Sequence, residues 1–230
     1  MLVYQRNPVL SVRTIGERVY QILRKNIIDL DLIPGQVLNM KDIAEELHVS
    51  RSPVRDAILK LNEEGLVDCI PQKGTTVSRI DMGRVQEERF IRHSLEEKVL
   101  RICLRRDMTP YQERFNEILN RQKRYIHTDR YREFLDYDDL FHQVFFQAAE
   151  KEFSWGIIQY AAGHYRRIRL MSLWNETITE NVYLQHTEML RALRSREIDR
   201  LLELFKEHCY KLRREKIDMM KQYPDYFSGL

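Results

Sequence analysis

The apolar positions of the first third of the chain change from a helical to a strand-like period. Helical spacing predicts three helices, Ile15–Leu30 behind an N-cap at Thr14, Met40–Leu47 behind Asn39, and one from Arg51 to Gly65. Alternating positions then predict strands over 66–70 and 75–78, joined by a short turn that contains proline and glycine. A helix, a helix–turn–helix and a hairpin, in this order, are typical of a winged helix-turn-helix.

The remainder of the chain has a helical period almost throughout. Six helices joined by short links predict an antiparallel bundle. The expected ranges are 84–106, 110–126, 128–149, 154–173, 179–193 and 198–221. The chain is therefore predicted to be mainly α, with a winged helix-turn-helix, a DNA-binding fold, over residues 1–80 and an all-helical bundle over 83–230.

Four polar residues interrupt the apolar stripes of these predicted helices. Asp138 and His142 are spaced i,i+4 and project from one helix face, between Phe134, Phe141 and Phe145. The other two core-facing polar residues are His186 and His208.

Burying such groups without partners costs about 2 kcal/mol or more each. A single histidine of this kind is more often a hydrogen-bonded core residue than a ligand. Three histidines and an aspartate together favour a divalent metal site, which zinc, nickel or manganese would suit.

The third predicted helix carries a basic, polar face. Arginines near the start of such a helix can contact guanine in the major groove, and its free N–H groups can hold phosphate. A basic face can equally be a solvated surface, and the ordered set of elements around it favours DNA binding. The candidate DNA contacts are Lys41, Ser50, Arg51, Ser52, Arg55, Lys73 and Gly74.

Composition adds little to this prediction, except that it argues against a membrane-spanning protein. The 38 Lys and Arg against 35 Asp and Glu leave a net charge of +3, so any DNA contact must come from a local patch. No apolar run is long enough for a membrane span. Three scattered cysteines without a CxxC pair favour reduced thiols and a cytoplasmic location.

The segment PGQVLNMKDIAEELHVSRSPVRDAILKLNEEGLVDCIPQKGTTVSRI resembles the GntR family of bacterial regulators. Its S-R-S-P-V-R-D-A stretch and its wing are the family's most specific features, and the seven candidate DNA contacts fall on the family's contact positions. Many members have arginine where this chain has Lys41, which retains a phosphate contact but loses bidentate geometry.

The second part resembles the FCD ligand-binding domain of the FadR subfamily, in its shorter VanR-like form. The D-x-x-F-H of Asp138–His142, with His186 and His208, matches its metal-binding positions, and Arg92 matches an arginine that often faces its ligand cavity. The resemblance implies that Arg92 binds an effector carboxylate; a helix-surface pair with Glu88 or Glu96 is the alternative.

Together these features predict a homodimeric regulator, with repression as the expected mode. It would bind double-stranded operator DNA under the control of a small carboxylate or sugar acid. Two other readings of the four ligands remain open. One is a sensor of the metal itself, and the other is a metal-dependent hydrolase, for which no general-base motif stands out.

Overall fold

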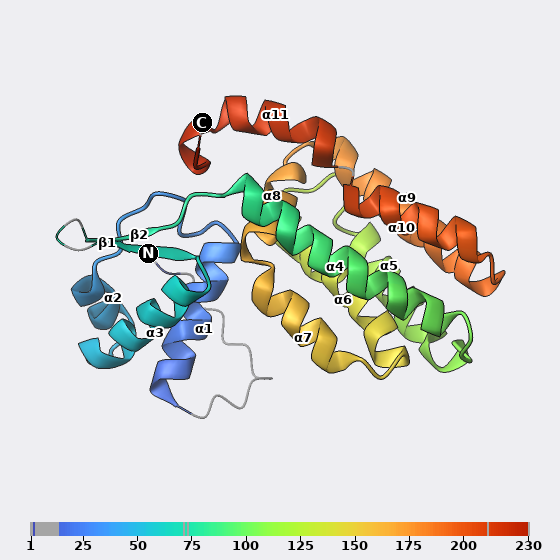
Figure 1. The fold of residues 1–230 in the computed structure, drawn as a ribbon, viewed down its shortest axis with the longest axis horizontal. Coiled ribbons are helices and arrows are strands. Elements are labelled where there is room, and N and C mark those ends of the chain that lie inside the picture. The colour runs from blue at the N-terminus through green and yellow to red at the C-terminus, as the bar shows by residue number, and fades with distance from the viewer. Residues whose placement is uncertain (1, 3–13, 71, 73, 211, 230) are drawn as a thin grey trace. The chain divides into compact units, whose positions relative to one another are not determined.

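The computed structural model describes residues 2, 14–70, 72, 74–210 and 212–229 (Figure 1). It divides into two compact units, one formed by Met1–Arg84 with Tyr223–Leu230 and the other by Val85–Gln222. The C-terminal tail therefore groups with the first unit, whereas the sequence analysis places it in the helical domain. No helix among the described residues is long and apolar enough to cross a membrane.

The first unit contains three helices and a two-stranded hairpin. The helices are α1 (Ile15–Ile28), α2 (Met40–Glu46) and α3 (Arg51–Glu63), and the antiparallel strands are β1 (Val67–Ile70) and β2 (Gly74–Val77). Thr14 and Asn39 cap α1 and α2 by accepting hydrogen bonds from the amides of Glu17 and Lys41, so both predicted caps are confirmed.

An apolar core holds these elements together. Leu23 of α1 and both Val54 and Leu61 of α3 are completely buried, and α1 packs along α3. Full burial of each such side chain contributes about 1.5–3 kcal/mol. Gly65 ends α3 with a φ of 74°, a conformation that glycine adopts without strain, and it turns the chain into the hairpin.

The second unit is helical. Its elements are α4 (Met82–Cys103, which begins in the first unit), η1 (Thr109–Tyr111), α5 (Gln112–Lys123), α6 (Tyr131–Ala148), α7 (Glu152–Ala161), α8 (Gly163–Ser172), α9 (Glu176–Arg194), α10 (Ile198–Tyr210) and α11 (Leu212–Gln222). Helix α6 packs against α5, α7 and α8, and α9 packs against α5 and α10. A short turn, η2 (Pro224–Tyr226), belongs to the tail.

Two predicted helices are each split into two. The 154–173 segment forms α7 and α8, separated at Ala162, whose ψ of 28° leaves the α-helical region. The amide of Tyr165, in the first turn of α8, donates to a carboxylate oxygen of Glu88 at 2.7 Å. This bond satisfies an amide that the break leaves without a helical partner. The 198–221 segment forms α10 and α11, and residue 211 between them lies outside the described residues.

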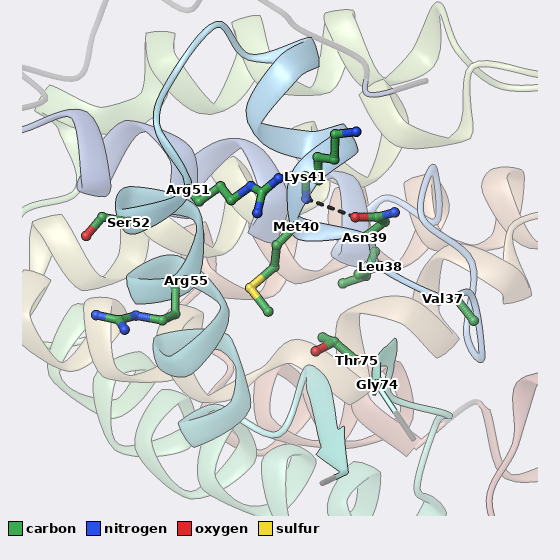
Figure 2. A pocket seen from close by; sticks show the side chains of 10 residues that line it. All are labelled: Val37, Leu38, Asn39, Met40, Lys41, Arg51, Ser52, Arg55, Gly74 and Thr75. Atoms are coloured by element: carbon green, nitrogen blue, oxygen red, sulfur yellow. Dashed lines mark hydrogen bonds between the residues drawn. The ribbon is translucent and has the colours of Figure 1, made fainter. Parts of the chain in front are cut away.

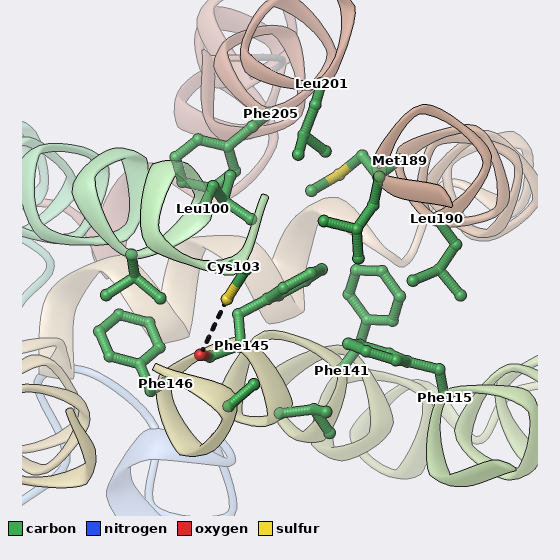
Figure 3. Close-up of a cluster of buried hydrophobic side chains, with 14 of the residues drawn as sticks. Leu100, Cys103, Phe115, Phe141, Phe145, Phe146, Met189, Leu190, Leu201 and Phe205 are labelled. Carbon is green, nitrogen blue, oxygen red and sulfur yellow. Dashed lines mark hydrogen bonds between the residues drawn. The ribbon is translucent and has the colours of Figure 1, made fainter. Parts of the chain in front are cut away.

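Aromatic side chains are prominent in the apolar core of the helical unit (Figure 3). The ring of Phe115 lies 5.4 Å from that of Phe141 and 4.9 Å from that of Phe145, at angles typical of favourable edge contacts. The Cys103 thiol donates to the carbonyl oxygen of Phe145 at 3.3 Å, which fixes α4 against α6. These contacts hold α4, α5 and α6 together around the apolar core.

The inward face of α4 is charged. Glu88, Arg92 and Glu96, spaced i, i+4, i+8, are all buried, while Phe90 is 61% exposed. The charged stripe faces buried polar partners: Arg92 lies near Asp138 and Asp139 of α6, and Glu88 accepts a hydrogen bond from the backbone amide of Tyr165 on α8.

Candidate DNA-binding and metal sites

A groove of about 710 Å³ lies in the first unit, between the start of α2, the first turns of α3 and the start of β2, next to the turn of the wing. Figure 2 shows Arg51, Ser52 and Arg55 on one wall and Gly74 with Thr75 on the other. The amide of Lys41 donates to the capping oxygen of Asn39 at 2.9 Å, which orients the start of α2 at the rim.

Five of the seven sequence-predicted DNA contacts line this groove. Lys41, Arg51, Ser52 and Arg55 are exposed there together with Gly74. Ser50 precedes them as the N-cap residue of α3, is exposed, and makes no side-chain capping bond. Lys73 lies outside the described residues.

The basic groups in the groove are only weakly neutralised. Lys41 lies 3.8 Å from Glu45 and Arg55 lies 3.8 Å from Asp56, in exposed pairs. Such pairs contribute little and give way readily to another anion. Arg51 has no ion-pair partner among the residues that the structure describes.

Unlike the basic residues of the groove, Lys60 contacts residues of α1. It is the remaining basic residue of α3, and its ammonium lies 3.2 Å from Glu17 and 3.7 Å from the ring centre of Tyr20. Lys60 therefore ties α3 to α1 and does not line the groove.

The four sequence-predicted metal ligands come together in the second unit. Asp138 and His142 from α6 meet His186 from α9 and His208 from α10, and one potential ligand atom of each lies within 4.8 Å of all the others. All four side chains are buried.

The spacing of these atoms suits a single ion. The Nε2 atoms of His142 and His208 are 3.2 Å apart, and the Nε2 atom of His186 lies 3.5 Å from Oδ1 of Asp138. A tetrahedral zinc ion with ligands at about 2.1 Å separates its ligand atoms by about 3.4 Å. The donor set of three imidazoles and one carboxylate is also one that zinc and similar ions prefer.

Each histidine is oriented through its other ring nitrogen. The Nδ1 atom of His186 contacts Oε1 of Gln122 at 2.9 Å, and that of His208 contacts Oε1 of Gln185 at 3.1 Å. The Nδ1 atom of His142 contacts Glu96. An oxygen partner at Nδ1 fixes the proton there and leaves the lone pair of Nε2 directed at the centre of the cluster. Gln122 is not among the residues predicted from the sequence, where Glu96 is expected only as a surface partner of Arg92.

A layer of buried ion pairs covers one side of the cluster. Arg169 contacts both Asp138 and Asp139, and Arg166 contacts Asp139. Burial raises the pKa of Asp138, but the nearby Arg169 and the three histidines outweigh burial and hold its pKa well below the ordinary value. The carboxylate of Asp138 is therefore charged and available as a ligand.

Arg92 lies in the same layer, fully buried and not on the helix surface. Its Nε donates to Glu96 at 3.2 Å. Its two terminal nitrogens have no hydrogen-bond partner among the described residues and lie 3.9 and 4.0 Å from Asp138 and Asp139. Burial lowers the pKa of Arg92, but Glu96 and other neighbours raise it above its ordinary value, so the guanidinium is charged.

Comparison with known families accounts for both units. Residues 15–77 match the family described as bacterial regulatory proteins of the gntR family, and residues 89–211 match the FCD domain. The chain belongs to the GntR family. As a GntR-family protein with an FCD domain it is a transcriptional regulator and not an enzyme, which excludes the hydrolase alternative.

Relatives of this GntR-family chain include characterised repressors. It is 29% identical over 224 residues to the HTH-type transcriptional repressor RspR of Escherichia coli, a match that covers 97% of each chain. It is 30% identical over 144 residues to the gluconate operon transcriptional repressor of Bacillus subtilis, which covers 63% of this chain and 59% of the relative.

Solved structures share the fold. E. coli McbR/YncC superposes with a TM-score of 0.73 at 18% identity, covering 92% of this chain and 99% of that one. A GntR regulator from Rhodococcus sp. RHA1 also gives a TM-score of 0.73, at 20% identity, with coverage of 88% and 97%. The predicted fold class is thereby confirmed.

Proposed function

We propose that this regulator binds its operator as a homodimer and that a small organic or sugar acid controls its operator affinity. The acid would bind at a divalent metal held by Asp138, His142, His186 and His208. The observation that carries the proposal is the convergence of these four buried ligand atoms within 4.8 Å. A buried polar cluster of this kind is costly unless its members are paired or bind an ion.

The metal would supply a Lewis-acidic centre that attracts anionic oxygen atoms. Arg92 would hold the acid next to it. One terminal nitrogen lies 3.9 Å from Asp138 and the other 4.0 Å from Asp139, and neither has a hydrogen bond among the described residues. A planar guanidinium with two unoccupied N–H edges suits a carboxylate, which accepts two parallel hydrogen bonds.

The name of one relative favours a sugar acid as the ligand. One relative is named as the repressor of a gluconate operon. Gluconate has a carboxylate beside a hydroxyl group, so it could contact a metal and an arginine together. Zinc, nickel and manganese all remain candidates for the ion.

A thermal-shift titration tests the proposal. The metal-stripped protein is titrated first with Zn²⁺, Ni²⁺ or Mn²⁺ and then with small carboxylic and sugar acids. We expect the metal to raise the unfolding temperature, and one class of acid to raise it further, because a ligand that binds only the folded state stabilises it. The Asp138→Ala/His208→Ala double variant should show neither increase.

The control is a His127→Ala/Asp129→Ala double variant, which makes the same two changes at exposed positions. It should respond like the wild type. A double variant of Asp138 and His208 that still responds to metal would place the ion elsewhere. A metal response without any acid response, with operator affinity following free metal, would instead support the metal-sensor alternative.

DNA binding would use two copies of the groove. Dimeric helix-turn-helix proteins place one recognition helix in each of two successive major grooves, so their operators are pseudo-palindromic. Sedimentation with and without a bound operator duplex tests this arrangement, since two chains per duplex are expected. The acid can change operator affinity only if it binds the two conformations of the dimer unequally.

A further inference from the structure

One buried carboxylate, that of Glu96 on α4, contacts two residues of the proposed sensor. Its Oε1 atom accepts a hydrogen bond from Nδ1 of His142, and its Oε2 atom accepts one from Nε of Arg92 at 3.2 Å. Glu96 is completely buried. The first partner is a proposed metal ligand and the second is the proposed effector arginine.

We propose that Glu96 is a positioning residue that couples metal binding to effector binding, by holding His142 and Arg92 at the same time. The inference rests on the proposed function of the cluster. Coupling of this kind is reciprocal: if metal binding fixes His142 and, through Glu96, Arg92, then an acid on Arg92 strengthens metal binding equally.

The choice of a carboxylate at this position supports the inference. His186 and His208 are each held by the amide oxygen of a glutamine, Gln122 and Gln185 respectively. A glutamine has one acceptor oxygen and is sufficient for one ring nitrogen. Glu96 faces two donors, and only a carboxylate offers an acceptor oxygen to each of them.

The position of Arg92 depends on this contact. Its Nε–H bond to Glu96 is the hydrogen bond that the structure gives its side chain, and its terminal nitrogens lie 3.9 Å from Asp138 and 4.0 Å from Asp139. Without the Oε2 acceptor, the guanidinium loses the bond that aims its outer edge.

The substitution Glu96→Gln separates the two contacts, since an amide satisfies one donor and presents an NH₂ group to the other. Zn²⁺ affinity is measured on the metal-stripped full chain by competition with a chromophoric chelator. We expect Glu96→Gln to weaken Zn²⁺ binding by about 10–100-fold, the usual effect of removing a partner that orients a ligand. The matched control is Glu97→Gln, which removes the same charge from the next residue, at a solvent-accessible pair with Arg101.

A spectroscopic readout tests the coupling itself. In ¹⁵N-labelled wild type, addition of Zn²⁺ should shift the Nε–H resonance of Arg92, and in Glu96→Gln that shift should disappear. A Zn²⁺ affinity of Glu96→Gln equal to that of Glu97→Gln overturns the inference. An Arg92 resonance that does not respond to Zn²⁺ in the wild type overturns it as well.

If Glu96→Gln does not fold, the role of Glu96 can still be tested in the wild type, through the protonation of the His142 ring. With Zn²⁺ bound, the His142 ring should keep its Nδ1 proton and coordinate through Nε2, which its nitrogen shifts report; coordination through Nδ1 overturns the inference. Failure of the proposed function looks different. In that case the Asp138→Ala/His208→Ala variant binds Zn²⁺ as the wild type does, or neither binds it. This outcome is visible without the Glu96→Gln and Glu97→Gln variants.

Discussion

Arg51 lies in the first turn of α3, on the wall of the groove, and has no ion-pair partner among the described residues. We expect Arg51→Ala to weaken binding to the specific operator by about 1–3 kcal/mol and to leave binding to random DNA nearly unchanged. The reason is that an arginine in the first turn of a recognition helix can read base edges, whereas phosphate contacts contribute to all sequences alike. Fluorescence anisotropy with a selected operator and a scrambled duplex measures both values.

Lys60→Ala is the control for this experiment, because Lys60 lies on the same helix but pairs with Glu17 outside the groove. It should leave the ratio of specific to non-specific affinity unchanged. An equal loss on both duplexes in Arg51→Ala would show that Arg51 holds phosphate and does not read bases.

The four proposed metal ligands could be predicted from the sequence because each is a polar residue on an otherwise apolar helix stripe. Glu96 and Gln122 could not be assigned in this way. Long polar side chains on a helix usually mark its solvent face, and Glu88, Arg92 and Glu96 form such a stripe on α4. That this stripe is buried follows from the packing of α4 against Asp138 of α6 and against the backbone amide of Tyr165 on α8.

At the scale of elements, nearly every helix and both strands could be predicted, because periodicity, caps and turn residues agree. The break between α7 and α8 was missed, since the 154–173 segment keeps a helical period and contains no proline. Gly163 at the start of α8 is the sole local signal, and a single glycine is tolerated within a helix. The break is stabilised from a distance, by the contact of Glu88 with the amide of Tyr165.

This contact gives a prediction for the stability of the helical unit. We expect Glu88→Ala to lower the free energy of unfolding by about 1.5–3 kcal/mol, the range for a hydrogen bond to a charged group. Glu88→Gln should cost less, since its amide oxygen can still accept from Tyr165. Denaturant unfolding followed by circular dichroism measures these differences, and Glu87→Ala, at the neighbouring exposed position, should be close to neutral. A loss in Glu87→Ala as large as that in Glu88→Ala would contradict this account of the break.

At the scale of the whole molecule, the chain ends in the unit where it begins. The amide of Ile80 donates to the carbonyl oxygen of Tyr226 at 2.7 Å, and the amide of Ser228 donates to the carbonyl oxygen of Ile80 at 3.1 Å. The C-terminal tail, which follows α11, thus forms a parallel β-bridge with the segment that follows β2. The bridge joins Ile80 and Phe227, whose side chains are both buried. Local periodicity could not predict this pairing, because a bridge between residues so distant in sequence leaves no periodic signal.

Phe227→Ala tests whether the buried ring holds the tail in place. Truncating a buried phenylalanine costs about 3–5 kcal/mol, which corresponds to roughly 100-fold or more in a local opening equilibrium. We therefore expect the amides of Ile80 and Ser228 to exchange with deuterium at least that much faster in the variant, by NMR-detected exchange. The amide of Val77, bonded to Gln36 at 2.9 Å in the same unit, is the internal reference and should keep its protection.

The substitution Asp225→Ala is the control for the tail, because it removes an exposed side chain two residues before Phe227. It should leave the exchange at Ile80 unchanged. Unchanged protection of Ile80 in Phe227→Ala would mean that the backbone bridge holds without the ring. Faster exchange at Val77 as well would mean that the whole first unit opens, so the tail would be a structural part of the DNA-binding unit and not a separable strap on it.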